Sequence, residues 1–218
     1  RIPTDTVVYL TRKIPVYNRR MKNTAGFERD VSWFTTYRKN GYDASFSISN
    51  AYQKTGFFPG AHGIPDLSKL TDDGNSRNIE LPYSFVNHLK VALHQGYAWG
   101  PMALSWDLGY QNNHREEWSS FHTHYSTQQI PQKDPDKELA FRLNTYSSNA
   151  MLRFLGNGKW EHTLGWDVQY QDNNIAGYSF LLPEYTRVTT GGLWLSNYKL
   201  NSQLTLSGGV RYDYGKIK

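Results

Sequence analysis

Residues 102–111 read MALSWDLGYQ, and this stretch carries the strongest indication of the fold. Its even positions, from Met102 to Tyr110, are apolar or aromatic, and its odd positions, from Ala103 to Gln111, are small or polar. Successive side chains of a β-strand point to opposite sides. A period of two therefore predicts a strand that lies between an apolar and a polar environment.

The same alternation recurs in three further stretches. Residues 42–53 read YDASFSISNAYQ, residues 160–171 read WEHTLGWDVQYQ and residues 203–214 read QLTLSGGVRYDY. A strand of a soluble sandwich alternates as well. A strand that crosses a bilayer needs about 9–11 residues, with aromatic residues where hydrocarbon meets water. The length of these stretches and the tyrosine near the end of each favour membrane-spanning strands.

The composition fits a transmembrane barrel better than a soluble core. The 218 residues are 38% hydrophobic and 15% aromatic, with a mean hydropathy of −0.68. No run of about 18 apolar residues is present, so no transmembrane helix is expected. A barrel that is apolar at alternate positions is polar on average, because its interior face is hydrophilic. The 16 tyrosines and 7 tryptophans suit a membrane interface, where the ring is in apolar surroundings and the polar tip stays hydrated.

Charge and cysteine content exclude several classes of function. The formal net charge is +5, but the chain has no basic helix or recognised nucleic-acid motif, so no nucleic-acid partner is expected. The scattered cations could instead attract an anionic ligand or the phosphates of lipopolysaccharide. Without cysteine there is no disulfide, thiolate metal site or thiol nucleophile.

Turn and loop signals divide the chain into about eight strands in an antiparallel meander. Short turns are predicted at 39–41, where Asn-Gly suits a type I′ hairpin, and at 99–101, 156–158 and 201–202. Long loops rich in Gly, Pro, Asn and Asp are predicted at about 55–78, 112–137 and 172–190. The predicted strands are residues 27–39, 42–54, 79–97, 102–112, 138–154, 159–171, 191–200 and 203–214. Outer-membrane barrels have short turns at the periplasmic end and long loops outside.

Two of the predicted strands have an ambiguous register. In 138–154 the apolar positions change parity after Leu143, so a β-bulge near Thr145 is predicted. In 191–200, Leu193 and Leu195 compete with Trp194 for the apolar face. An unclosed sheet would expose unpaired edges to lipid, which is costly. Residues 1–218 are therefore predicted to be one partial barrel domain of a larger barrel.

Several phrases of the sequence carry a family resemblance. They are GFERD at 26–30, GFFPGAHGIP at 56–65, GWDVQYQDNN at 165–174, FLLPEY at 180–185 and LSGGVRYDY at 206–214. With these phrases the chain resembles the barrel of TonB-dependent outer-membrane receptors of the Bacteroidetes type, which are similar to ferric-siderophore receptors.

The resemblance implies a barrel of about 22 strands with a plugged lumen, of which this chain would supply about a third. It also implies active uptake of a scarce ligand, a ferric siderophore or another small ligand, across the bacterial outer membrane. The expected partners are the TonB complex, the lipid bilayer and lipopolysaccharide. TonB would act through a plug domain, which is not recognisable in these residues. Haem, cobalamin and oligosaccharide stay open as ligands.

Residues of the long loops are the candidates for ligand contact. Aromatic rings could stack on an aromatic or catecholate ligand, and arginines could neutralise its charge. The alternative is that the same rings pack the loops against one another. The candidates are Phe57, Phe58, His62, Arg77, Arg115, Trp118, Phe121, Tyr125, Tyr178, Tyr185 and Arg187.

The histidines give no firm metal site, and no cofactor is expected. His122 and His124 lie on one side of an extended segment and could hold a metal or haem iron, although polar loop histidines are more common. His62 could likewise be a haem ligand or an ordinary loop residue. A separate set of polar residues could line the path to a plug, namely Ser84, His88, Lys90 and His94. No catalytic constellation appears, so an enzyme is not expected.

Two other functions fit the same strands. A passive porin or small structural outer-membrane barrel would lack the plug. A soluble β-rich binding module, such as a lipocalin-like protein, would not need detergent.

Overall fold

The computed structural model describes residues 2–9, 11–61, 64–65, 74–123, 125–155, 158–179 and 181–218. These residues form β-strands and one short 3-10 helix, η1 (Tyr17–Arg19). Across these ranges no helix has the length and apolar character needed to cross a membrane. The all-β prediction is confirmed.

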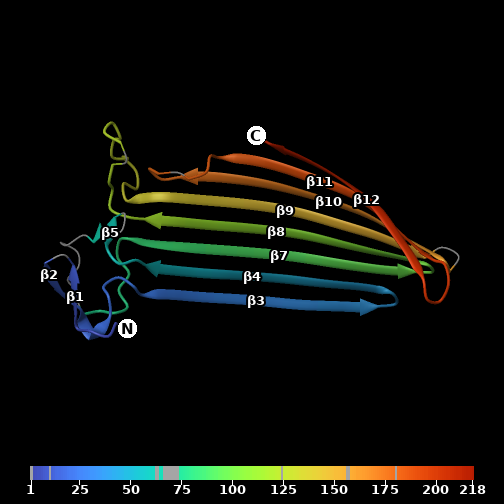
Figure 1. Cartoon of the computed structure of the whole chain (residues 1–218), viewed down its shortest axis with the longest axis horizontal. Helices are drawn as coiled ribbons and strands as arrows, with labels where there is room; N and C mark the ends of the chain where they lie inside the picture. The colour runs from blue at the N-terminus through green and yellow to red at the C-terminus, as the bar shows by residue number, and fades with distance from the viewer. Residues whose placement is uncertain are drawn as a thin grey trace.

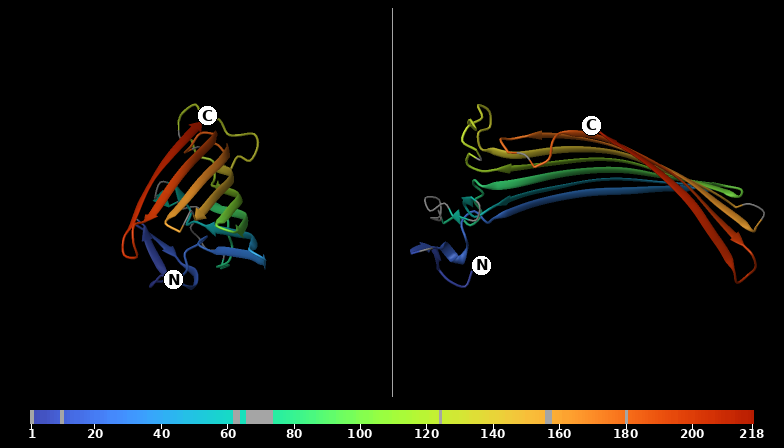
Figure 2. Two further views of the ribbon diagram at one scale, coloured as in Figure 1. Left: turned by 90° about the vertical axis from the view of Figure 1, so that its right-hand side faces the viewer. Right: turned by 45° about the horizontal axis from the view of Figure 1, so that its top comes forward.

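Eight long strands form one antiparallel sheet (Figure 1). They are β3 (Gly26–Lys39), β4 (Tyr42–Gly56), β7 (Tyr83–Trp99), β8 (Met102–Trp118), β9 (Lys137–Leu155), β10 (Trp160–Ala176), β11 (Tyr185–Lys199) and β12 (Thr205–Ile217). The order across the sheet is β12-β11-β10-β9-β8-β7-β4-β3, which is the predicted meander. Figure 2 shows this sheet as a single long layer that curves and twists along its length.

Short turns and long loops segregate to opposite ends of the sheet (Figure 1). Residues 40–41, 100–101, 156–159 and 200–204 connect strands at one end, which we call the turn end. Asn40 (φ 49°) and Gly41 (φ 80°) both have positive φ, as the predicted type I′ turn requires. Residues 57–82, 119–136 and 177–184 connect strands at the other end, the loop end.

Two small ribbons also lie at the loop end (Figure 1). One pairs β1 (Thr6–Tyr9) with β2 (Arg12–Pro15), and the other pairs β5 (Gly60–Ala61) with β6 (Ile64–Pro65). Ile14 and Val16 are buried in the first of these units.

Two predicted loops are too long. β8 continues to Trp118 and β9 begins at Lys137, so the second loop is 119–136 instead of 112–137. β10 continues to Ala176 and β11 begins at Tyr185, so the third loop is 177–184 instead of 172–190. Most residues of these strand ends are polar on both faces, with exceptions such as Ile175 and Val188, so they lack the regular alternation by which a strand is recognised. The first loop runs from 57 to 82 and is longer than predicted.

The predicted bulge near Thr145 is wrong. Thr145 pairs with Gln111 on one side and Gln171 on the other, without a shift of register. The one irregularity between β8 and β9 lies at Glu117/Trp118. Phe141 and Leu143 therefore lie on the same face as Thr145, and Tyr146 lies on the opposite face. The apolar residues change parity because the chemistry of each face changes along β9, without a bulge.

The register defines two faces of the sheet. The apolar face contains Leu104, Leu152 and Leu164, which are paired across β8, β9 and β10. The polar face contains the alternate residues, such as Ser105 and Thr163. In β11, Trp194 and Tyr198 lie on the apolar face, which resolves the ambiguous register. Leu193 and Leu195 lie on the polar face.

The sheet has almost no protein core. Among the described residues the buried hydrophobic side chains are Ile14, Val16, Leu139 and Ala140. By contrast Leu164 is 46% exposed and Trp166 is 54% exposed, both on the apolar face. An exposed apolar surface of this extent marks a surface of contact with another protein or with a membrane.

Candidate functional site

Two belts of aromatic residues border the apolar face. Toward the loop end, the Tyr110, Tyr146 and Tyr170 rings follow one another across β8, β9 and β10, with centroids 5.0 and 6.2 Å apart. Toward the turn end, Tyr97 and Trp99 are 5.2 Å apart and a second pair, Trp160 and Tyr198, is 4.5 Å apart. Leucine, valine and phenylalanine fill the band between the belts.

The tryptophans inside this band have bonded N–H groups. The Trp106 indole donates to the Ser148 hydroxyl at 2.8 Å, and the Trp166 indole donates to the Thr190 hydroxyl at 3.0 Å. In water an exposed indole needs no protein partner. In hydrocarbon an unpaired N–H is costly, so pairing with a hydroxyl of the neighbouring strand suits a lipid-facing surface.

Asn23 fixes the backbone at the loop end of β3 and β4. It is buried (6% exposed), has a positive φ of 56°, and its amide donates to the carbonyl oxygens of Phe57 and Pro82, both at 2.8 Å. Its side-chain oxygen accepts from the Glu80 N–H at 2.7 Å. One side chain thus ties together three segments. No local sequence pattern indicates this role, because the partners are 34 to 59 residues away.

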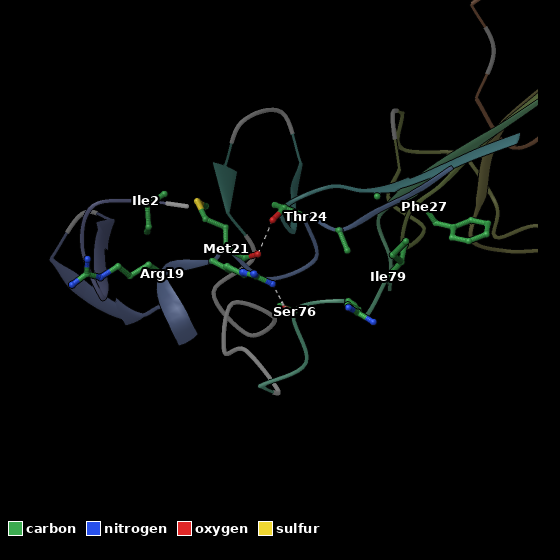
Figure 3. A pocket seen from close by; sticks show the side chains of 11 residues that line it. Ile2, Arg19, Met21, Thr24, Phe27, Ser76 and Ile79 are labelled. Carbon is green, nitrogen blue, oxygen red and sulfur yellow. Dashed lines mark hydrogen bonds between the residues drawn. The ribbon is translucent and has the colours of Figure 1, made fainter. Parts of the chain in front are cut away.

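A cavity of about 810 Å³ lies between the N-terminal segment and the first long loop (Figure 3). Among the described residues that line it, the cations are Arg19, Arg20 and Arg77, and none is a carboxylate. Ile2, Met21, Phe27 and Ile79 supply apolar surface. A cavity of this size, with a few charged groups on a partly apolar lining, has the character of a small-ligand site.

The three arginines of the cavity differ in charge balance. Arg19 is 3.2 Å from Asp5, so its charge is compensated. Arg20 donates to the Ser76 hydroxyl at 2.5 Å, and this neutral partner does not compensate the charge of the guanidinium group. Arg77 makes no ion pair with any residue that the structure describes. Arg77, a predicted ligand residue, therefore shares this cavity with Arg20. Arg20 was not a predicted ligand residue, because only the fold brings the two segments together.

Three further candidates are strand residues of the polar face. Arg115 is in β8, and Tyr185 and Arg187 are in β11. The register places Arg115 in one row with Phe141 and Ile175, while Tyr185 pairs with Asn173 beside Leu143. Arg115 is paired with Glu117. These residues form a partly apolar patch on the polar face at the loop end. Their prediction as loop residues is wrong, because they belong to strands. They do lie at the predicted end of the sheet.

Phe121 and Tyr178 pack two loops together. Their rings meet edge to face at 5.0 Å, and the Tyr178 hydroxyl is 2.8 Å from Ser119 Oγ, which donates to Glu138 at 2.6 Å. Burial raises the pKa of the Tyr178 hydroxyl, and Glu138 raises it further. The phenol is therefore neutral at physiological pH. For this pair the alternative interpretation, in which rings join the loops, is confirmed.

The remaining aromatic candidates have different surroundings. Trp118 ends β8, its indole donates to Glu116 at 2.7 Å, and it stacks on Tyr83 at 6.0 Å. Phe57 and Tyr125 are 48% and 61% exposed, so both rings are available at the loop end. Phe58 is half-buried beside the fully buried Pro59.

The structure offers no metal site within the residues it describes. No group of three or more His, Asp or Glu side chains there could hold an ion. His122 lies against Tyr178, with ring centroids 5.9 Å apart. His62 and His124 lie outside the described residues.

Polar residues proposed to line a path share the polar face as predicted. His94 is 2.6 Å from Asp107 and 3.5 Å from Asp43, on the two strands beside its own. His88 is 3.3 Å from Gln111. This face therefore carries paired charges and amides where the opposite face carries leucine and tryptophan.

No family model matches the chain, and no curated protein matches it. The resemblance to TonB-dependent receptors stays a prediction.

Proposed function

We propose that this chain is a sector of a bacterial outer-membrane barrel, and that the barrel is a TonB-dependent receptor for a small anionic ligand such as a ferric siderophore. The observation that carries the proposal is the apolar face, with its two aromatic belts and the bonded indoles of Trp106 and Trp166. This arrangement is typical of a lipid-facing sheet.

The edges of the sheet support a larger barrel. In the described part of the chain, β3 pairs only with β4 and β12 pairs only with β11. The outer edges of β3 and β12 would leave backbone groups unpaired in lipid, where each costs several kcal/mol. Additional strands of the same barrel would satisfy them.

The arginine-lined cavity supports the class of ligand. Arg20 and Arg77 form no ion pair with a described residue and lie beside apolar surface, so they would attract an anion with an apolar or aromatic body. The long-loop end of an outer-membrane barrel faces outside, where such a ligand would arrive. Coupling to the TonB complex comes from the family resemblance alone, and a plug domain would then occupy the space beside the polar face.

Uptake of an iron-55-labelled ferric catecholate tests this function. A host that lacks the gene is complemented with the full-length protein or with the variant Arg20→Gln/Arg77→Gln. We expect the variant to take up the probe at least tenfold more slowly at limiting concentration, because two charge-assisted contacts of about 1.5–3 kcal/mol each are lost. A protonophore should abolish uptake by the wild-type protein.

Arg12→Gln is the matched control, because Arg12 belongs to the same N-terminal unit but does not line the cavity. It should take up the probe at the wild-type rate. Uptake that survives the protonophore would support the passive porin instead, and equal rates for all variants would remove the cavity from the proposal.

A further inference from the structure

The apolar face becomes polar beyond the loop-side tyrosine belt, although the strands continue. Asn112 follows Tyr110 on this face and its amide donates to Asn144 at 2.8 Å, while the Tyr110 hydroxyl donates to the same Asn144 oxygen at 3.1 Å. Asn50 and Asn87 form a second amide pair at 2.8 Å. These strand ends display amides where the band below displays leucine.

Cations without carboxylate partners lie among these amides. The Arg29 guanidinium is 5.7 Å from the centroid of the Tyr52 ring, and the Lys54 ammonium is 4.0 Å from the centroid of the Tyr83 ring. Arg142 is exposed on the same face. None of the three forms an ion pair with a residue that the structure describes.

Lys137 shows what a compensated cation looks like on this face. It is 4.9 Å from the centroid of the Trp118 ring, but it also lies 3.1 Å from Asp134 and 3.6 Å from Glu116. Glu116 is engaged by His114 and Trp118 as well. Among the other acids of these strand ends, Asp172 accepts from Asn174 at 2.9 Å and Glu138 accepts from the Ser119 hydroxyl at 2.6 Å. Arg29, Lys54 and Arg142 therefore form a strip of cations that no carboxylate among the described residues pairs with.

The register sets the spacing of this strip. Arg29, Tyr52, Asn87, His114 and Arg142 form one row across β3, β4, β7, β8 and β9. Lys54 is diagonal to Arg29, since it pairs with Phe27. Arg29 and Lys54 thus form one cationic point and Arg142 a second, four strand spacings or about 19 Å away.

The depth of the polar region distinguishes between kinds of lipid. From Asn112 to Trp118, β8 extends about 20 Å beyond the belt, which is roughly 14 Å along the membrane normal at a tilt near 45°. The headgroup layer of a phospholipid leaflet is only about 5–7 Å deep. A sugar headgroup is deeper, and amides pair well with its hydroxyls.

We propose that this surface, formed by Arg29, Lys54 and Arg142 with the adjacent asparagines, binds the phosphorylated sugar headgroup of a glycolipid in the outer leaflet. The inference rests on the proposed membrane-spanning sheet. The two arginines would bind phosphate oxygens in the bidentate manner of guanidinium groups, and Lys54 would add a point charge.

Lipid retention measures this site. The full-length protein is extracted from the outer membrane in mild detergent, and bound bis-phosphorylated lipid A is counted by native mass spectrometry. We expect the variant Arg29→Gln/Lys54→Gln/Arg142→Gln to retain at least about tenfold less lipid than the wild type, since three charge-assisted contacts are lost. Retention by the wild type should also fall as salt rises.

The matched control removes the same charge elsewhere. Lys39→Gln/Lys90→Gln/Lys199→Gln changes two cations at the turn end and one on the polar face, and it should retain lipid like the wild type. Equal retention by both triple variants would overturn the site. Equal retention of dephosphorylated lipid A by the wild type would also overturn it, because the sugar alone would then be recognised.

Membrane insertion separates this inference from the proposed function. If the wild-type protein is absent from the outer-membrane fraction, both are overturned. If it inserts and the cationic triple variant retains lipid normally, only the headgroup site is overturned.

Discussion

Glycines of the polar face make room for larger neighbours. A Cβ added at Gly209 would lie 2.4 Å from Leu195 Cδ2 and 2.8 Å from the Trp194 carbonyl oxygen, and one at Gly165 would lie 2.7 Å from Leu193 Cγ. The two leucines that do not fit the polar pattern of β11 thus occupy space left by glycines on the neighbouring strands. Gly191 similarly leaves space for Arg211, which is 2.7 Å from Asp167 and 2.6 Å from Asp213.

Gly209→Ala should destabilise the protein by about 1–3 kcal/mol, because the added methyl group would force Leu195 and the β11 backbone to move. Gly208→Ala is the control, since a Cβ at Gly208 on the opposite face meets nothing within 4 Å. The measurement is the free energy of unfolding by denaturant in detergent micelles. A stability of Gly209→Ala equal to that of Gly208→Ala would contradict the packing described for Leu195.

At the scale of elements, the second and third long loops form one unit. Tyr178 joins them through Ser119 and Phe121, the Gln128 amide donates to the Tyr178 carbonyl at 2.9 Å, and the Ser179 N–H donates to the Glu138 carbonyl at 2.9 Å. The loops are therefore held in place beside the ends of β9 and β10. A ligand-binding surface formed by them would be largely ordered before the ligand arrives.

Tyr178→Ala should release the loop at 119–136, because the ring contact with Phe121 and the hydroxyl contact with Ser119 are both lost. We expect limited proteolysis within 119–136 to become several-fold faster in the detergent-solubilised protein. Tyr125→Ala in the same loop is the control, since this ring is 61% exposed and its removal should leave the rate unchanged. Similar rates for the two variants would show that Tyr178 does not hold the loops together.

At the scale of the whole molecule, the environment on each side of the sheet decides stability. The described residues have little buried core, and the side chains that a soluble protein would bury lie on one uncovered face. Backbone pairing between neighbouring strands gives the sheet its order. In the proposed membrane-spanning sheet, the apolar face would contact lipid, and the polar face and the loop end would carry the function.

Leu104→Arg or Leu164→Arg should prevent stable insertion, at a cost of about 2–4 kcal/mol each near the bilayer midplane. Ser105→Arg and Thr163→Arg, on the polar face of the same strands, should be tolerated. The measurement is the amount of folded protein in the urea-washed outer-membrane fraction. If arginine is tolerated equally on both faces, the sheet does not lie in lipid and a soluble binding module becomes the better interpretation.

The amino-acid pattern alone is enough to predict most of the strands, their two faces and the two ends of the sheet. Alternation in stretches such as 102–111 is enough, because the pleat sends successive side chains to opposite sides whatever the rest of the fold does. The Asn40-Gly41 turn is likewise local, since only residues that tolerate positive φ suit it.

Features that depend on neighbouring strands become visible only in the folded chain. The polar strand ends beyond Asn112 have no alternation and are held by ladder pairing, so sequence patterns missed them. Leu193 lies on the polar face because Gly165 of β10 leaves space there, and Phe141 needs no bulge because the register of β9 is continuous. The cavity of Arg20 and Arg77 exists because backbone and side-chain contacts bring residues 56 positions apart together, as in the bond from Arg20 to Ser76. Contacts over such sequence distances are set by the whole fold, and a local pattern cannot encode them.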